Sequence, residues 1–226
     1  MLELRVALPH DHEGAVAVWR AAQGGRGLRP GAARVARVAE KVGEGLLVVG
    51  AEGPSVVGMA LAEPGRAKDG AGDLAPGLLH LSMVFVAPRS QRQGVGSALV
   101  EALADAAWEQ GFRSVSVWSR TPEFYEACGL APSGRTQVLA DGTVATQLVA
   151  ELEPPVRPVV VRSEGIRLGQ LLKLAELVET GSEGKDLLAA GGVEVNGETE
   201  LRRGRQLLHG DVVAARDRAV RVVLET

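Results

Sequence analysis

The sequence is poor in cysteine, in aromatic residues and in long apolar runs. Cys128 is the only cysteine, which excludes an internal disulfide and a cysteine-rich zinc site. No apolar run approaches the roughly 18 residues of a membrane helix, and the N-terminus, MLELRVAL, has an early acidic residue and no long apolar core. We therefore expect a cytoplasmic protein with no membrane partner.

A strong net charge is missing too. The formal charge is −3, which argues against attraction of the whole molecule to nucleic acid. Of the 226 residues, 46% are hydrophobic and 23% are charged, as in an ordinary globular protein, and the length suffices for two cores. Any contact with nucleic acid has to be local.

The stretch from Leu78 to Leu103 predicts a buried strand that leads, through a turn with two glycines, into a helix beginning at Gly94. Unsatisfied backbone N–H groups at such a helix start attract phosphate. A Walker loop is excluded because no lysine occurs between Lys68 and Lys173. A dinucleotide loop is disfavoured because Leu99 stands where a third glycine is needed. The pattern predicts a site for some other phosphate ligand.

Two motifs at a fixed separation narrow the choice of phosphate ligand. Val86-Ala87-Pro88 followed by Gln91-x-x-Gly94-x-Gly96, and then Phe124-Tyr125-Glu126-x-x-Gly129-Leu130, together resemble the GNAT family of acyl-CoA N-acyltransferases. The resemblance implies acetyl-CoA or a close acyl-CoA as co-substrate and no metal. It also implies that backbone groups of Val84 and Val86 pair with the pantetheine. The loop residues implied to cradle the pyrophosphate are Gln91, Arg92, Gln93, Gly94, Val95, Gly96 and Ser97.

The resemblance assigns a role to Tyr125, the only tyrosine, which matches the residue that protonates the leaving thiolate. The attacking amine also needs a base. His80 and Ser82, which share strand parity with Val84, and Glu63 and Asp73, in the adjoining predicted loop, are candidates; none is chosen. Many relatives carry an asparagine where this chain has Trp118-Ser119-Arg120-Thr121. Cys128 is interpreted as a packing residue.

Hydrophobic periodicity over residues 1–153 predicts an α/β domain, with a mixed, mostly antiparallel sheet flanked by helices. The residues from Leu2 to Leu8 alternate as a strand, Asp11 to Gln23 form a helix, and Glu63 to Gly77 lack periodicity and are predicted as a loop. Asp141-Gly142 indicates a hairpin. This order agrees with the GNAT fold.

Three prolines between Pro154 and Pro158 predict an extended linker over residues 154–161. Residues 162–226 then form a small α+β domain, with a helix over Leu168–Glu179, a second helix up to Ala190, and a hairpin turn at Asn196-Gly197. The segment from Ile166 to Val213 resembles the S-four type RNA-binding domain with its αL motif, named after a small-subunit ribosomal protein.

The resemblance implies RNA contacts from basic residues of the second domain: Lys173, Lys185, Arg202, Arg203 and Arg205. Residues 162–226 hold 10 Lys and Arg against 11 Asp and Glu, a weak balance for a nucleic-acid module. No aromatic residue follows Tyr125, so bases cannot be stacked. RNA binding and a salt-bridged face or protein contact both stay open.

The predicted function is direct transfer of an acetyl group from acetyl-CoA to a primary amine, by a domain tethered to an RNA-binding domain. One alternative is a non-catalytic RNA or ribosome binder whose first domain only senses acyl-CoA. Another is an enzyme that modifies an antibiotic or metabolite and carries a dispensable tail. The sequence does not identify the acceptor, small molecule or protein, nor the base, the RNA, or whether the protein is a homodimer.

Overall fold

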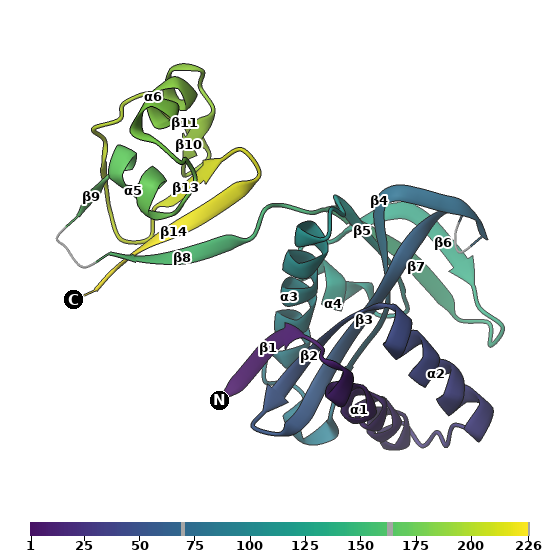
Figure 1. Cartoon of the computed structure of the whole chain (residues 1–226). Helices are drawn as coiled ribbons and strands as arrows, with labels where there is room; N and C mark the ends of the chain where they lie inside the picture. Colours follow the sequence, from purple (N-terminus) through teal and green to yellow (C-terminus); the bar gives the residue numbers. More distant parts are fainter. Residues whose placement is uncertain (69–70, 162–164, 226) are drawn as a thin grey trace. The chain divides into compact units, whose positions relative to one another are not determined.

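The computed structural model describes residues 1–68, 71–161 and 165–225. The chain divides into two compact units, Met1–Glu153 and Pro154–Thr226 (Figure 1). Each unit buries its own apolar side chains. The first unit has a core on each face of its sheet, and the second has one core.

The first unit is organised around a seven-stranded sheet with the order β1-β2-β3-β4-β5-β7-β6. Its neighbouring strands are antiparallel except β4 and β5, which are parallel. This confirms the predicted mixed, mostly antiparallel sheet. The strands are β1 (Leu2–Val6), β2 (Leu46–Glu52), β3 (Ser55–Lys68), β4 (Ala71–Val86), β5 (Ser114–Ser119), β6 (Ala131–Val138) and β7 (Val144–Glu151).

Helices cover both faces of this sheet. On one face, apolar side chains of α1 (His12–Gly25) and α2 (Ala32–Glu44) pack against strand residues such as Met59 and Phe85. On the other face, α3 (Val95–Glu109) and α4 (Pro122–Glu126) pack against residues such as Val48 and Val84. Two short 3-10 turns, η1 (Pro9–Asp11) and η2 (Pro88–Ser90), precede α1 and α3. Side chains point alternately to the two faces along each strand, so the strands contribute apolar side chains to both cores.

The prediction of a loop over Glu63–Gly77 was wrong, because β3 and β4 extend into this range. Their register shifts repeatedly, and these irregularities, together with Gly and Pro, hide the alternation. One shift makes Ser82 an extra residue, because Leu61 pairs with Met83 while Ala62 pairs with Leu81. Side-chain parity changes at this bulge.

The bulge overturns the predicted parity of His80 with Val84. Leu79 and Leu81 are buried in the core beneath α3, where Val84 also packs. His80, between the two leucines, therefore points to the opposite face, which is the face covered by α1 and α2. Strand β4 therefore places His80 on the face covered by α1 and α2, and Leu79 and Leu81 in the core beneath α3.

The second unit combines a five-stranded sheet, order β11-β10-β13-β14-β8, with a two-stranded ribbon, β12-β9. Its helices are α5 (Leu168–Leu174) and α6 (Gly181–Ala189). This is the small α+β arrangement that the sequence predicted. The strands are β8 (Val156–Val161), β9 (Ile166–Arg167), β10 (Val193–Val195), β11 (Glu198–Thr199), β12 (Gln206–Leu207), β13 (Val212–Ala215) and β14 (Arg218–Leu224).

Two predictions for this unit differ from the structure. The segment predicted as a linker contains β8, which pairs in parallel with β14; it lies at the sheet edge, where Pro158 is tolerated. Helix α5 ends at Leu174 rather than Glu179, because Glu176 adopts a left-handed φ of 54°. The predicted turn at Asn196-Gly197 has φ values of 55° and 80°, as a type I′ turn requires.

Candidate functional site

The site begins where β4 and β5 part. The two strands pair over Leu78–His80 and Ser114–Ser116, and their pairing ends there. The Ala87 amide donates a 2.8 Å hydrogen bond to the Val57 carbonyl of β3. Because backbone groups alternate in an antiparallel pair, those of Val84 and Val86 point away from β3, into the gap. The side-chain amide of Gln91 donates to the Val86 carbonyl at 3.0 Å.

A strained turn leads from β4 into α3. Arg92 has a φ of 59° and Gly94 a φ of 79°, and both are left-handed. Gly94 is the N-cap of α3 and no side chain caps the helix, so its first amides keep their donor capacity. No acidic residue occurs between Asp73 and Glu101. The helix dipole and the Arg92 cation therefore act together on any anion at this point.

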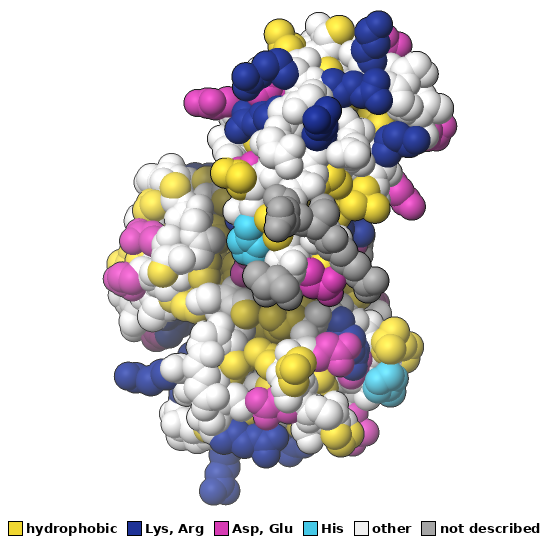
Figure 2. Space-filling model, turned by 90° about the vertical axis from the view of Figure 1, so that its left-hand side faces the viewer, with side chains coloured by type: hydrophobic (Ala, Val, Ile, Leu, Met, Phe, Trp, Pro, Cys, Tyr) yellow, Lys and Arg dark blue, Asp and Glu magenta, His cyan; other side chains and the backbone are white. Residues whose placement is uncertain are grey.

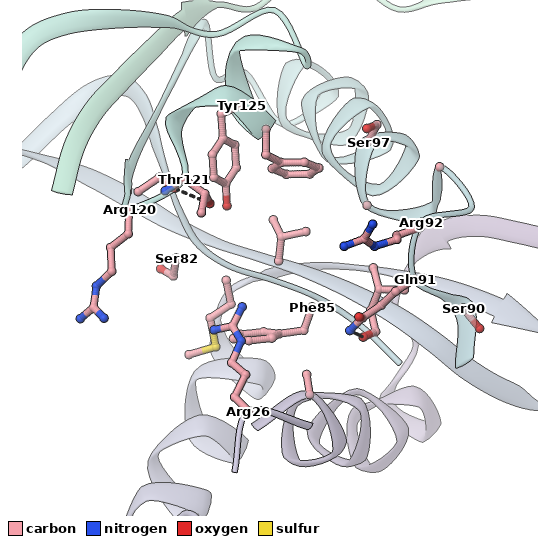
Figure 3. A pocket seen from close by; sticks show the side chains of 18 residues that line it. Arg26, Ser82, Phe85, Ser90, Gln91, Arg92, Ser97, Arg120, Thr121 and Tyr125 are labelled. Carbon is pink, nitrogen blue, oxygen red and sulfur yellow. Dashed lines mark hydrogen bonds between the residues drawn. The ribbon is translucent and has the colours of Figure 1, made fainter. Parts of the chain in front are cut away.

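A cavity of about 850 Å³ lies at this junction (Figure 3). It brings together most of the residues that the sequence singled out: Val84, Val86, Gln91, Arg92, Gly94, Gly96, Ser97 and Tyr125. Two predicted residues do not line it. The Gln93 side chain donates to the Arg89 carbonyl at 3.1 Å, and Val95 is buried in the core. Only the backbone amides of these two are available to a ligand.

Tyr125 closes the cavity from α4, and its hydroxyl points inward (Figure 3). A Cβ at Gly96 would lie 3.3 Å from the Phe124 ring, so this glycine lets α3 and α4 approach closely. The Phe124 and Tyr125 rings meet edge to face, with centroids 4.8 Å apart. Burial, with a smaller effect of Cys128, raises the pKa of Tyr125 to about 12, so the phenol keeps its proton at neutral pH.

The sequence did not point to Arg26 as part of the site. Helix α1 runs through Gly25, beyond the predicted end at Gln23, and the Arg26 guanidinium lies 5.9 Å from the centroid of the Phe85 ring. Arg26 and Phe85 both line the cavity. The glycines around Arg26 give a loop signal, and no sequence pattern would have placed it here.

Ser119, Arg120 and Thr121 complete the wall where relatives often carry an asparagine. The Thr121 amide donates to Ser119 Oγ at 3.0 Å, which fixes the turn before α4. Arg120 pairs with Asp141 at 2.9 Å. The Thr121-Pro122 pair, a helix-start signal, was the one sequence indication that this segment turns here.

A second cavity, of about 670 Å³, lies on the α2 side and shares Ser82 and Met83 with the first. Glu63 Oε2 accepts hydrogen bonds from Lys41 Nζ and Ser82 Oγ, both at 2.6 Å. Burial opposes ionisation of Glu63, but these two bonds outweigh it and hold its pKa below the ordinary value. Asp73, another candidate base, is exposed and lines neither cavity.

His80 faces Glu63 across the β3–β4 pair and lines the same second cavity. Its Nδ1 lies 3.3 Å from Ser116 Oγ, and burial lowers its pKa. The imidazole is therefore neutral at pH 7. Of the base candidates, His80, Glu63 and Ser82 come together, and they do so on the face opposite Val84.

In the second unit, two of the predicted RNA-contacting arginines are already paired. Glu200 is 5% exposed and accepts from Arg202 Nη2 at 2.8 Å and Arg205 Nη1 at 3.0 Å. The hydrogen bonds from Arg202, followed by that from Arg205, hold the pKa of Glu200 far below its ordinary value. Lys173, Lys185 and Arg203 are exposed.

Arg203 lies over the start of α5. A Cβ at Gly169 would come within 2.5 Å of its Cγ, and one at Gly181, the start of α6, within 3.8 Å of its Nη2. The Gly169 amide donates to the Arg203 carbonyl at 3.0 Å, so the turn Arg202–Arg205 also caps α5. Lys and Arg side chains gather on the C-terminal unit in the view of Figure 2, with acidic side chains mostly at the margin.

Residues 1–68, 71–161 and 165–225 contain neither a metal-ligating cluster nor a membrane-spanning helix. Among them, no group of three or more His, Cys, Asp or Glu side chains is placed to hold a metal ion. Nor is any of their helices both long enough and apolar enough to cross a membrane.

A parallel strand pair that opens beside an uncapped, glycine-rich helix start, with a tyrosine facing the opening, defines an acyl-CoA-binding acyltransferase. Comparison with family models agrees: the acetyltransferase (GNAT) family model matches residues 14–130 and the S4 domain model matches residues 159–223. The chain belongs to the GNAT family and carries a C-terminal S4 domain. It is an acetyl-CoA-dependent N-acetyltransferase, as the sequence predicted.

Individual relatives resemble one domain each. The probable ribosome maturation protein RlbA of Bacillus subtilis is 46% identical over 56 residues, which are 25% of this chain and 79% of that protein. The ribosomal-protein-S18-alanine N-acetyltransferase of Escherichia coli is 19% identical, with a TM-score of 0.53 over 67% of this chain and 94% of that one. A Brucella melitensis GNAT acetyltransferase solved with acetyl-CoA is 19% identical, with a TM-score of 0.52 over 69% and 91%. The two solved structures share the fold with the first unit.

Proposed function

We propose that acetyl-CoA binds with its pyrophosphate on the amides of Arg92–Ser97 and its pantetheine along Val84 and Val86. The observation that carries this proposal is the uncapped start of α3 in a stretch without acidic residues, facing a cavity of about 850 Å³. Arg92 and Arg26 add cations to the cavity wall. Backbone pairing with the pantetheine extends the sheet where β5 has turned away.

The acceptor amine enters from the second cavity, which meets the first at Ser82 and Met83. This geometry supports direct attack on the thioester, with the acceptor reaching the acetyl group near Ser82 and Met83. The neutral imidazole of His80 is then available to take the proton that the amine releases.

Tyr125 stabilises the leaving sulfur as a hydrogen-bond donor. Its pKa of about 12 lies above that of an ordinary thiol, so the phenol favours hydrogen bonding to the sulfur over complete proton transfer. A protonated phenol aimed into the cavity can still donate to the sulfur as negative charge develops. This refines the sequence-based expectation of full protonation by a phenol with pKa near 10.

The S4 domain binds structured RNA through Lys173, Lys185 and Arg203, which are exposed, while Arg202 and Arg205 hold the turn together through Glu200. A relative of this chain is named as a probable ribosome maturation protein, which supports a ribosomal RNA as partner. We propose that the acceptor amine is carried by a molecule close to that RNA.

Calorimetric titration with acetyl-CoA tests the cofactor site, using Ser97→Asp and the matched control Ser97→Ala. Ser97 is an exposed residue in the first turn of α3, where an aspartate favours the helix yet repels a pyrophosphate. We expect roughly micromolar binding by the wild type and Ser97→Ala, and a loss of about tenfold or more in Ser97→Asp. Equal binding by both variants, or no binding by the wild type, would refute the site.

A further inference from the structure

Lys41 places a primary amine beside the point where the two cavities meet. Its Nζ and Ser82 Oγ bond the same Glu63 oxygen, each at 2.6 Å, so Nζ lies no more than about 5 Å from Ser82 Oγ. Ser82 lines the cofactor cavity as well as the second one. The Lys41 side chain is 44% exposed, so it has room to move toward the cofactor.

Among the described residues that line the second cavity, Glu63 is the only acidic one. An ammonium group that enters this cavity therefore finds one carboxylate, and the Lys41 ammonium already occupies it. Lys41 thus stands where the amine of an acceptor would be held. Lysine is also rare in this chain, which has four: Lys41, Lys68, Lys173 and Lys185.

His80 is the candidate acceptor for the proton that the Lys41 ammonium has to lose. A lysine amine is neutral only about one part in 10³ at pH 7, so acyl transfer to it needs a proton acceptor. His80 faces Glu63 in the register of β3 and β4, and its Nδ1 lies 3.3 Å from Ser116 Oγ. The neutral imidazole can receive the proton directly or through one water.

We propose that Lys41 is acetylated in cis by the acetyl-CoA bound at the start of α3; this inference rests on the proposed function. The bond from Nζ to the acetyl carbon forms and the carbon–sulfur bond breaks. The ammonium releases two protons overall, one that ends on the CoA thiol and one that passes through His80 to solvent. The products are acetyl-lysine and free CoA.

Acetylation would change the second cavity. It removes the positive charge of Lys41 and with it the ion pair to Glu63. The Glu63 carboxylate, which keeps its hydrogen bond from Ser82, can then pair with the ammonium of an incoming acceptor. Modification of Lys41 would in this way open the second cavity to an acceptor amine, in the place where the Lys41 ammonium now pairs with Glu63.

The test is to incubate the full-length protein with acetyl-CoA and follow acetylation of each lysine by peptide mass spectrometry. Lys173 and Lys185, both exposed, report non-enzymatic acetylation in the same sample. We expect Lys41 to react about tenfold faster than either one, with a first-order rate that does not change with protein concentration. The Ser97→Asp protein should show Lys41 reacting no faster than the two reference lysines.

Different failures have different meanings. If the wild type binds acetyl-CoA but acetylates Lys41 no faster than Lys173 and Lys185, the inference is wrong and the proposed function stands. A rate that rises with protein concentration would show transfer between molecules and refute the reaction in cis. Absence of acetyl-CoA binding would refute the proposed function and this inference together. Lys41→Arg, which keeps a cation for Glu63, checks that the modified peptide is assigned correctly.

Discussion

Two turns of this protein present arginine at the start of a helix, and they differ in what neutralises the charge. The turn Gln91–Gly94 leads into α3, within a stretch that has no acidic residue from Leu74 to Val100. The turn Arg202–Arg205 caps α5, but the buried Glu200 pairs with two of its three arginines. The first turn has no carboxylate of its own, whereas the second has one, Glu200, which Arg202 and Arg205 share.

The comparison shows why a count of basic residues is a poor guide to anion binding. The field at a turn depends on its net charge and on where each charge is held, and a buried carboxylate offsets one unit of the neighbouring guanidinium charge. The sequence predicts Arg202 and Arg205 as RNA contacts, whereas in the structure both form ion pairs with Glu200 that hold the turn. Arg92 is supported by a helix dipole and lies in a stretch without acidic residues, so its charge is available to an anion.

The largest effect is expected from Tyr125→Phe, which removes the hydroxyl that points into the cavity beside the first turn. The rate of acetyl transfer should fall by about 10²-fold or more, because the leaving sulfur loses its hydrogen-bond donor. Acetyl-CoA affinity should stay within about threefold of the wild type, since the phosphate contacts are untouched. Single-turnover release of CoA and calorimetry measure the two quantities. An unchanged rate would favour a domain that only senses acyl-CoA.

Arg92→Gly tests what the guanidinium contributes to binding at the first turn, Gln91–Gly94. Loss of the guanidinium should weaken acetyl-CoA binding by about tenfold, while relief of the left-handed φ of 59° should raise the free energy of unfolding by up to about 1 kcal/mol. Calorimetry and chemical denaturation measure the two effects. Arg89→Ala is the control, because Arg89 does not line the cavity. A loss of stability together with normal binding would contradict the account.

The sequence predicted those parts of the site that depend on local backbone chemistry. The glycine-rich turn, the helix that follows it and the short helix of Tyr125 all have local signals, and the family models and the fold confirm the class of protein. Its assignment of individual site residues stays a prediction, although the structure gathers most of them around one cavity.

The sequence could not predict features that depend on pairing between distant residues. The bulge at Ser82 is a property of the β3–β4 register, and it moved His80 to the opposite face from Val84. Likewise, only the folded second unit shows that Glu200 is buried between Arg202 and Arg205. The position of Arg26 depends on the packing of α1 against the sheet, which no local pattern encodes.

Glu200→Gln tests whether the buried carboxylate holds the second turn, Arg202–Arg205. Without the carboxylate, the turn loses both ion pairs, and the amides that it caps at the start of α5 should exchange with solvent faster. Hydrogen exchange of the full-length protein, over residues 165–175 and 198–207, measures this. The exchange of residues 84–97 serves as the internal control and should not change. Equal exchange at α5 would mean that Glu200 does not hold the turn.

The pH dependence of the second unit follows from the same glutamate. Its pKa is lower in the folded than in the unfolded protein, so its contribution to stability is present above about pH 4.3 and is lost as the pH falls below that value. Acid unfolding of the unit should therefore be steeper in the wild type than in Glu200→Gln. Hydrogen exchange at several pH values checks this, and parallel acid profiles would contradict it.

The smallest effects are expected at single RNA contacts. Arg203→Gln should weaken binding of a structured ribosomal RNA fragment by a few fold and reduce the salt-dependence slope by about 1. Arg202→Gln should change the slope less, because the Arg202 guanidinium is held in an ion pair with Glu200. Fluorescence anisotropy at several salt concentrations compares the pair. Equal slopes in the two variants would remove the distinction between the arginines.

The most direct test of the account is hydrogen exchange of the full-length protein with and without acetyl-CoA. The account predicts slower exchange for amides in residues 91–97 and along β4 at Val84 and Val86, because these donors bind the cofactor. Residues 202–205, which belong to the second unit, should not respond. Protection at the second turn, or none at the first, would contradict the claim that the uncapped start of α3 is the acetyl-CoA site.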